Sequence, residues 1–166
     1  MVQVRVAGVA MDAAGQHVIL LKPIDELPGE GKLLPIWIGP QEATSILIAI
    51  EGAEMPRPLA HDLMRTLLDT LGAEVARAEV SRVDDGTFFA EITLHAEGAA
   101  HLVDARPSDA VALASRTGSP LWVADEVMDE AGIPDTLTSD EEVDADARVD
   151  EFKEFLEHVD PDDFRE

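Results

Sequence analysis

The sequence predicts an α+β fold, in which helices pack on a mixed, largely antiparallel sheet and an acidic C-terminal helix follows. Three observations predict it. Several short segments alternate apolar and polar residues with the period of a β-strand, and four others carry apolar residues at helical spacing. The two kinds of segment do not alternate strictly along the chain, which favours an α+β fold over a doubly wound sheet.

The expected strands are short segments bounded by turn residues. Ala14-Gly15 and Asp85-Gly86 each separate two of them. Asp85-Gly86 predicts a tight hairpin, because glycine readily adopts the positive φ that such turns require. In chain order the expected strands are Val2–Met11, His17–Pro23, Leu33–Ile38, Ala73–Val83, Thr87–Ala96, Ala100–Asp104 and a short one at Leu121–Ala124.

The expected helices are marked by their ends. Each begins at a proline or at a residue that can cap the first turn, and each closes at a glycine. They run from Pro40 to Gly52, from Pro58 to Gly72, from a cap at Ser108 to Gly118, and from Asp125 to Gly132.

The chain divides into a body over residues 1–132 and an acidic tail over residues 133–166. The last 28 residues alone hold 13 acidic and three basic residues. Ser139 and Glu142 form a capping-box pattern, and apolar residues follow at helical spacing, which predicts an amphipathic helix packed on the body. A solvated acidic appendage is the alternative. The apolar residues are Val149, Phe152, Phe155, Leu156 and Val159.

The net charge of −23 opposes binding to a polyanion, because affinity for nucleic acid normally comes from Lys and Arg that release condensed counterions. Only three of the 12 basic residues are lysines: Lys22, Lys32 and Lys153. We interpret this surface as adaptation to a salt-rich cytoplasm, where screening shortens the Debye length to about 3 Å at roughly 1 M salt. A nucleic acid partner would then be bound at high ionic strength.

The absence of cysteine excludes disulfides, thiolate metal sites and cysteine nucleophiles, so any metal must be held by carboxylates or histidines. The N-terminus lacks the charged and then apolar layout of a signal peptide. The longest apolar run, around residues 45–50, is far too short to cross a bilayer. We therefore expect a cytoplasmic protein that has no membrane partner.

Polar residues that could carry chemistry cluster where the expected helices begin, beside backbone N–H groups that favour anions. Glu42 lies one turn into its helix and either complements the helix dipole or faces a cleft. Arg57, His61 and Asp62 lie around the start of the next helix, with Arg65 one turn beyond His61. Histidine beside aspartate suits proton transfer or metal binding, whereas a surface histidine and a first-turn acid are the structural alternative.

A denser group follows where the strand ending at Asp104 leads into the third helix. Asp104, Arg106, Ser108 and Asp109 lie within six residues. Two carboxylates and an arginine could hold a divalent ion and clamp a phosphate. The structural alternative is that Ser108 caps the helix, Asp109 complements its dipole and Asp104 pairs with Arg106.

Three motifs occur in order: PIWIGPQEA, RPLAHDL, and DARPSDAVALA followed by PLWV. In this order and at this spacing the chain resembles the bifunctional nuclease family, formerly a domain of unknown function, over roughly Val2 to Gly132. The resemblance implies a phosphodiesterase of low sequence specificity that acts on RNA and DNA and depends on a divalent metal. Ala60 stands where the family often has threonine, so the hydroxyl beside His61 is lost.

Carried onto this chain, the resemblance implies two sets of site residues. Three carboxylates would hold Mg²⁺ or Mn²⁺: Asp104, Asp109 and Glu42. The catalytic set would consist of His61, Asp62, Arg57, Arg106 and Ser108. In this set His61 would assist a proton transfer, and Arg57 or Arg106 would contact the phosphate.

A non-catalytic binding or regulatory module is the alternative function, and the sequence leaves open whether the chain is an enzyme. In that case the motif residues would form structural ion pairs and helix caps. The net charge and the scarcity of aromatic residues, with no Tyr, five Phe and two Trp, favour this alternative. For either function we expect a homo-oligomer, with a dimer favoured.

Overall fold

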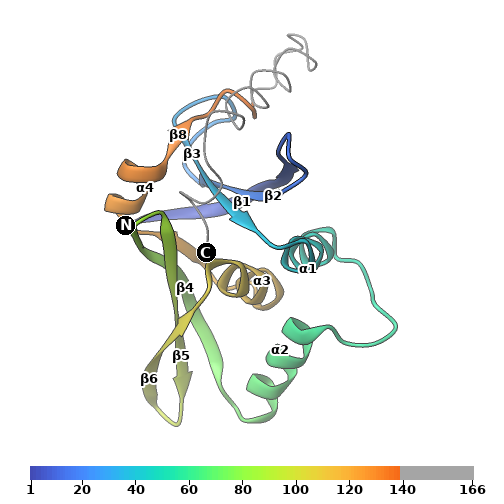
Figure 1. The fold of residues 1–166 in the computed structure, drawn as a ribbon. Helices are drawn as coiled ribbons and strands as arrows, with labels where there is room; N and C mark the ends of the chain where they lie inside the picture. The colour runs from blue at the N-terminus through green and yellow to red at the C-terminus, as the bar shows by residue number, and fades with distance from the viewer. Residues whose placement is uncertain (139–166) are drawn as a thin grey trace.

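The computed structural model describes residues 1–138 and confirms the α+β class, with helices against a mixed sheet (Figure 1). The strand order is β6-β5-β4-β7-β1-β2-β3-β8. Neighbours are antiparallel except for β4 and β7, which are parallel. The strands are β1 Val2–Met11, β2 His17–Pro23, β3 Lys32–Ile38, β4 Glu74–Asp84, β5 Thr87–Ala96, β6 Ala99–Ala105, β7 Leu121–Val123 and β8 Ile133–Pro134.

The hairpin predicted at Asp85-Gly86 joins β4 to β5. Both of its residues adopt a positive φ, 47° at Asp85 and 73° at Gly86. Aspartate is among the residues that tolerate this conformation, and glycine adopts it freely. The two-residue turn therefore fixes the antiparallel register of β4 and β5, with Asp84 opposite Thr87.

Four helices lie in the described part of the chain: α1 Pro40–Glu51, α2 Ala60–Thr70, α3 Pro107–Thr117 and α4 Asp125–Ala131. Two of the expected helix starts were wrong. Arg106, not Ser108, is the N-cap of α3, because Pro107 has a φ suited to the first helical position and disfavours helical backbone in the residue before it. In α2 the extended residue is Leu59, whose backbone N–H donates to the Asp62 carboxylate at 2.8 Å, so the helix starts two residues after Pro58.

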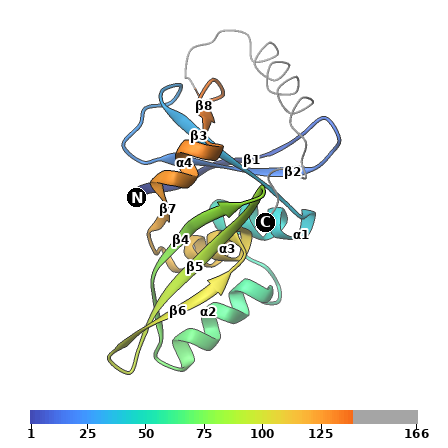
Figure 2. The same ribbon diagram turned by 60° about the vertical axis from the view of Figure 1, so that its left-hand side comes forward.

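Helix α3 is the centre of the fold. It contacts α1 and α2 on one side and β4 and β5 on the other (Figure 2). Its five consecutive residues from Ala110 to Ala114 are all buried, and three of them are alanines, whose small side chains allow close packing. Val18 and Leu20 of β2 and Trp37 of β3 form a separate small hydrophobic cluster.

Residues 133–138, which begin the segment predicted as the tail, pack on the body. Ile133–Pro134 forms β8 and pairs with Lys32–Leu33 of β3. Asp135 forms an ion pair with Lys22, and both side chains are completely buried. Residues 139–166, where the sequence predicts an acidic helix, lie outside the described residues.

The outer surface of α2 is unusually apolar. His61 is its only buried residue, and Leu68 packs in part against the core, whereas the other two leucines and the methionine face outward. No helix within residues 1–138 is long and apolar enough to cross a membrane. The exposed side chains are Leu63, Met64 and Leu67, together with Leu71 at the C-terminal end of the helix.

Candidate functional site

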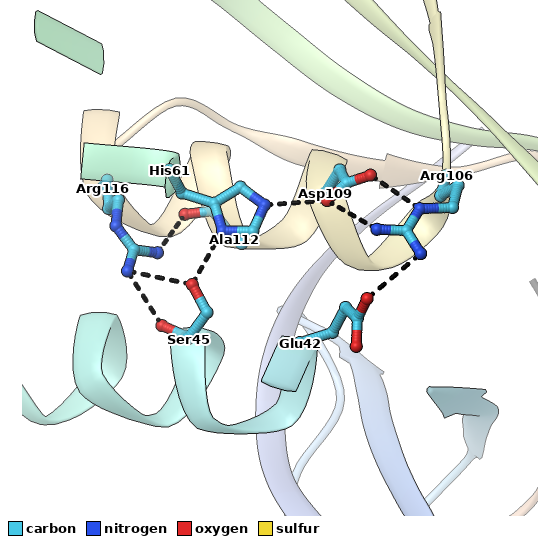
Figure 3. A network of polar contacts seen from close by, with 7 residues as sticks. All are labelled: Glu42, Ser45, His61, Arg106, Asp109, Ala112 and Arg116. Carbon is cyan, nitrogen blue, oxygen red and sulfur yellow. Dashed lines mark hydrogen bonds and ion pairs between the residues drawn. The ribbon is translucent and has the colours of Figure 1, made fainter. Parts of the chain in front are cut away.

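The three sequence motifs meet where α1, α2 and α3 lie together (Figure 3). Arg106 donates from Nε and Nη2 to the two carboxylate oxygens of Asp109, at 2.8 and 3.2 Å. Its Nη1 donates to Glu42 at 3.1 Å. On the other side, Asp109 Oδ1 lies 2.8 Å from Nε2 of His61. One chain of contacts thus joins Glu42, Arg106, Asp109 and His61.

The network continues inward from His61. Nδ1 of His61 lies 2.7 Å from the Ser45 hydroxyl. Arg116 donates to the same hydroxyl and to the Ser45 carbonyl, both at 3.1 Å, and to the Ala112 carbonyl at 3.0 Å. Its Nε donates to Asp62 at 2.6 Å. Arg116 therefore ties all three helices together.

Helical spacing places these side chains on facing surfaces. Glu42 and Ser45 lie three residues apart on α1, and Asp109 and Arg116 lie two turns apart on α3. Gly39 gives Glu42 its place, since a Cβ at this position would lie 2.3 Å from Oε2 of Glu42. The glycine before α1 thus leaves room for the carboxylate to fold back toward the start of the helix.

Two aspartates in the network are held in their charged form. Burial alone would raise the pKa of Asp109, but hydrogen bonds from Arg106 and His61 outweigh it, so the pKa lies below its ordinary value. The Arg116 hydrogen bond, together with the Leu59 backbone N–H, lowers the pKa of Asp62. Both groups therefore act as anions that fix the direction of the arginine side chains.

His61 occupies the interior of the network, with only 8% of its side chain exposed. Serine, histidine and aspartate stand in the hydrogen-bonded order of a nucleophilic triad. However, Ser45 is buried and its hydroxyl accepts a hydrogen bond from Arg116, so this hydroxyl does not face solvent. Both ring nitrogens of His61 are engaged within the protein, so His61 positions Asp109, and its part in proton transfer stays a prediction.

A cavity of about 440 Å³ opens at the outer end of the network. Glu42 and Arg106 form one part of its wall, and the guanidinium side chain of Arg106 is 53% exposed. The opposite part comes from the turn before β2 and from the end of β3. The cavity is lined by Gly15, Gln16, His17, Trp37, Ile38, Gly39, Pro40, Glu42 and Arg106.

Comparison with known proteins identifies the family. The profile of the bifunctional nuclease domain matches residues 20–136, which is more than half of the chain. The chain belongs to the bifunctional nuclease domain family. An uncharacterized protein of Mycobacterium tuberculosis is 42% identical over 166 residues and is matched over 98% of both chains.

Two plant proteins resemble this bifunctional nuclease domain over a shorter region. Bifunctional nuclease 1 of Arabidopsis thaliana is 30% identical over 115 residues, which cover 68% of this chain and 34% of the plant protein. Bifunctional nuclease 2 of Oryza sativa subsp. japonica is 28% identical over 117 residues, again 68% of this chain and 34% of the plant protein. The shared part is thus about one third of each plant protein.

The structure brings together some of the predicted site residues of this bifunctional nuclease domain. Glu42, His61, Arg106 and Asp109 form one network, and Asp62 joins it through Arg116. Three others lie elsewhere on the surface or in the core. Arg57 is exposed in the connection before α2, Asp104 is exposed on β6 opposite Glu91 of β5, and Ser108 is fully buried in the first turn of α3.

The three carboxylates assigned to a divalent ion do not fit one in this arrangement. Within residues 1–138, no group of three or more His, Asp or Glu side chains is placed to hold a metal. Arg106 is ion-paired with both Glu42 and Asp109, and its guanidinium would repel a second cation there. We therefore derive no chemical step through a metal, and dependence on Mg²⁺ or Mn²⁺ stays a prediction.

Ser45, Arg116 and His17 were not among the site residues predicted from the sequence. The first two could have been found from helical spacing, because Ser45 shares a face with Glu42 and Arg116 shares one with Asp109. His17 carries no such signal, since it begins a strand far from the three motifs in sequence. Its place in the cavity that Arg106 also lines depends on the fold.

Proposed function

We propose that this bifunctional nuclease domain is a phosphodiesterase that cleaves RNA and DNA with low sequence specificity. The observation that carries the proposal is the half-exposed Arg106 guanidinium, held by Glu42 and Asp109 at the edge of the cavity. A guanidinium fixed in this way offers planar donors that match phosphate oxygens. Membership of the family, and the names of the plant relatives, support nucleic acid as the substrate.

Each residue of the network receives a role from its position. Arg106 contacts the phosphate, while Asp109 keeps the guanidinium oriented through two hydrogen bonds. His61 in turn holds Asp109, and Ser45 and Arg116 hold His61. The exposed Arg57 supplies a second cation for the nucleic acid backbone.

The acidic surface sets the conditions for this activity. At a net charge of −23 the protein repels nucleic acid at low ionic strength, and added salt weakens that repulsion. Cleavage should therefore be measured at high KCl concentration, in keeping with the proposed salt-adapted origin and a cytoplasmic location.

The test compares cleavage of end-labelled single-stranded RNA and DNA by the full chain at high KCl concentration. We expect Arg106→Gln to lower kcat/KM by about a hundredfold, in line with the loss of one group that stabilises developing charge. Arg82→Gln is the matched control, because Arg82 lies over the Phe89 ring and does not line the cavity. Absence of cleavage by the wild type would contradict the proposed nuclease activity. An unchanged rate in Arg106→Gln would contradict the proposed role of Arg106 at the site.

A parallel assay with a chelator tests the predicted metal. Loss of cleavage that is restored by Mg²⁺ or Mn²⁺ would support dependence on a divalent ion. Unchanged cleavage after removal of metal would contradict it and would agree with the ion pairs that Arg106 makes to Glu42 and Asp109.

A non-catalytic, homo-oligomeric module is the second candidate. The observation that favours it is the ion pairing among motif residues, together with the exposed apolar side chains of Leu63, Leu67 and Leu71 on one side of α2. We expect a dimer that Leu67→Glu weakens, measured by light scattering during size-exclusion chromatography. A dimer without nuclease activity would favour the module, whereas a monomer would remove the support that α2 gives it.

A further inference from the structure

We propose that the cavity beside Arg106 binds the scissile phosphodiester with one flanking nucleoside, and that His17 protonates the leaving sugar oxygen. This inference rests on the nuclease activity proposed above. His17 precedes residue 20, where the match to the family profile begins, so the family assignment does not supply this role.

The cavity has the size and chemistry for such a ligand. Its volume of about 440 Å³ lies within the usual range of small-ligand pockets, roughly 300–1,000 Å³. Gln16 and His17 line it from the β1–β2 side, and Glu42 and Arg106 line it from the helix side. A phosphate at Arg106 would thus lie in a space that also contains an imidazole and a carboxylate.

His17 differs from His61 in its access to this space. His61 is buried and uses both ring nitrogens within the protein. His17 is half-buried and lines the cavity. The other histidines of residues 1–138, His95 and His101, are exposed on the β5 and β6 strands.

The backbone of His17 is held from both sides. It pairs with Met11 of β1 and with Ile38 of β3, so both neighbouring strands fix its position. The turn before it is held by the buried Asp12, which accepts hydrogen bonds from the backbone N–H of Gln16 at 2.8 Å and from the Trp37 indole at 3.0 Å. This wall of the cavity is therefore preorganised for a ligand.

The proposed step is hydrolysis by water. A water oxygen forms a new bond to phosphorus, and the carboxylate of Glu42 accepts the proton that this water loses. The bond between phosphorus and the leaving sugar oxygen breaks, and that oxygen takes a proton from the His17 imidazolium. The products are a phosphate monoester and an alcohol, and the 2′-hydroxyl takes no part, so the step serves RNA and DNA alike.

The first test measures kcat and KM of His17→Gln on the oligonucleotide substrate, with His95→Gln as the matched control. General acid catalysis contributes about a hundredfold or more. We expect kcat of His17→Gln to fall by about that factor, with KM little changed. His95→Gln should match the wild type.

The second test separates proton donation from a structural role. A thymidine p-nitrophenyl phosphodiester releases a stable anion that needs no proton. His17→Gln should cleave it at nearly the wild-type rate if the only loss is the acid. A hundredfold loss on both the oligonucleotide and the p-nitrophenyl substrate would overturn the proposed role of His17.

The outcomes distinguish this inference from the function on which it rests. If the wild type cleaves and His17→Gln cleaves the oligonucleotide at the same rate, the proposed role of His17 is wrong while the proposed nuclease function is retained. If the wild type does not cleave, the proposed function fails first. Binding is read separately from the NMR signals of the His17 ring during titration with the dinucleotide TpT, and signals that do not shift would overturn the pocket.

Discussion

Nε2 of His61 lies 2.8 Å from Oδ1 of Asp109, although the two residues are 48 positions apart in the chain. The contact joins α2 to α3 and leaves His61 without a ring nitrogen for an outside ligand, since Nδ1 is bonded to Ser45. Asp109, held in this way, accepts a hydrogen bond from Nε of Arg106 and so orients the guanidinium. A buried histidine thus fixes an arginine at the cavity.

Replacing His61 by alanine should cost about 1–3 kcal/mol of unfolding free energy, because the buried Ser45 hydroxyl and the Asp109 carboxylate each lose a partner. Urea denaturation measures the loss, with the exposed His95→Ala as control. A cost equal to that of the control would contradict the structural role of His61.

Replacing Gly39 by alanine should displace the Glu42 carboxylate without unfolding the protein. The new Cβ would lie 2.3 Å from Oε2 of Glu42, which is the end of a flexible side chain and can move. The backbone at Gly39, with φ −70° and ψ 160°, suits alanine. We expect nuclease activity to fall while the melting temperature stays close to that of the wild type.

Gly8→Ala is the matched control for Gly39→Ala, because a Cβ at Gly8 meets nothing within 4 Å. Full activity in both variants would show that the position of Glu42 has no influence on cleavage. A crystal structure of Gly39→Ala would show directly whether the contact between Glu42 and Arg106 is lost.

Replacing Lys22 by methionine should destabilise the protein by about 3–5 kcal/mol, because it leaves the buried Asp135 charge without its cation. Lys32→Met is the matched control. Its ion pair with Asp129 is exposed, so its loss should cost no more than about 1 kcal/mol. The double change of Lys22→Met with Asp135→Leu should recover much of the loss, and a purely additive effect would contradict the pairing.

The same ion pair makes stability depend on pH in the acid range. Burial alone would raise the pKa of Asp135, but hydrogen bonds from Lys22, Thr138 and Leu137 lower it from 3.8 to about 2. A carboxyl group whose pKa is lowered by folding stabilises the folded state at pH values above its pKa in the unfolded chain. This contribution, about 2 kcal/mol, is lost as the pH falls from about 4 to about 2.

Denaturation of the wild type and of Asp135→Asn over this pH range measures that contribution. The difference in stability between the two proteins should shrink as the pH falls, because the wild-type carboxyl becomes protonated. A difference that stays constant between about pH 5 and about pH 2 would show that Asp135 is not the titrating group.

Added salt should raise the melting temperature, because the acidic surface repels itself at low ionic strength. The measurement is thermal denaturation in KCl between about 0.1 M and about 3 M. Equal melting temperatures across this range would remove the support for adaptation to a salt-rich setting.

Local patterns in the sequence determined most of the secondary structure. All seven expected strands form with ends that differ from the prediction by one residue at most, because alternation along a strand and the Asp85-Gly86 turn are properties of neighbouring residues. Within residues 1–138 one further strand, Ile133–Pro134, is too short to show a period and exists because β3 lies beside it. The same local signals placed four helices, with errors at two of their starts.

The sequence by itself also determined which polar residues were worth considering, because Glu42, His61 and Asp109 stand in motifs at the helix starts. Only the tertiary structure decided how they are used. Contacts between residues 48 and 64 positions apart depend on how three helices pack, and no local pattern encodes that. Packing buries His61 and brings His17 to the cavity, because burial and access belong to the folded surface.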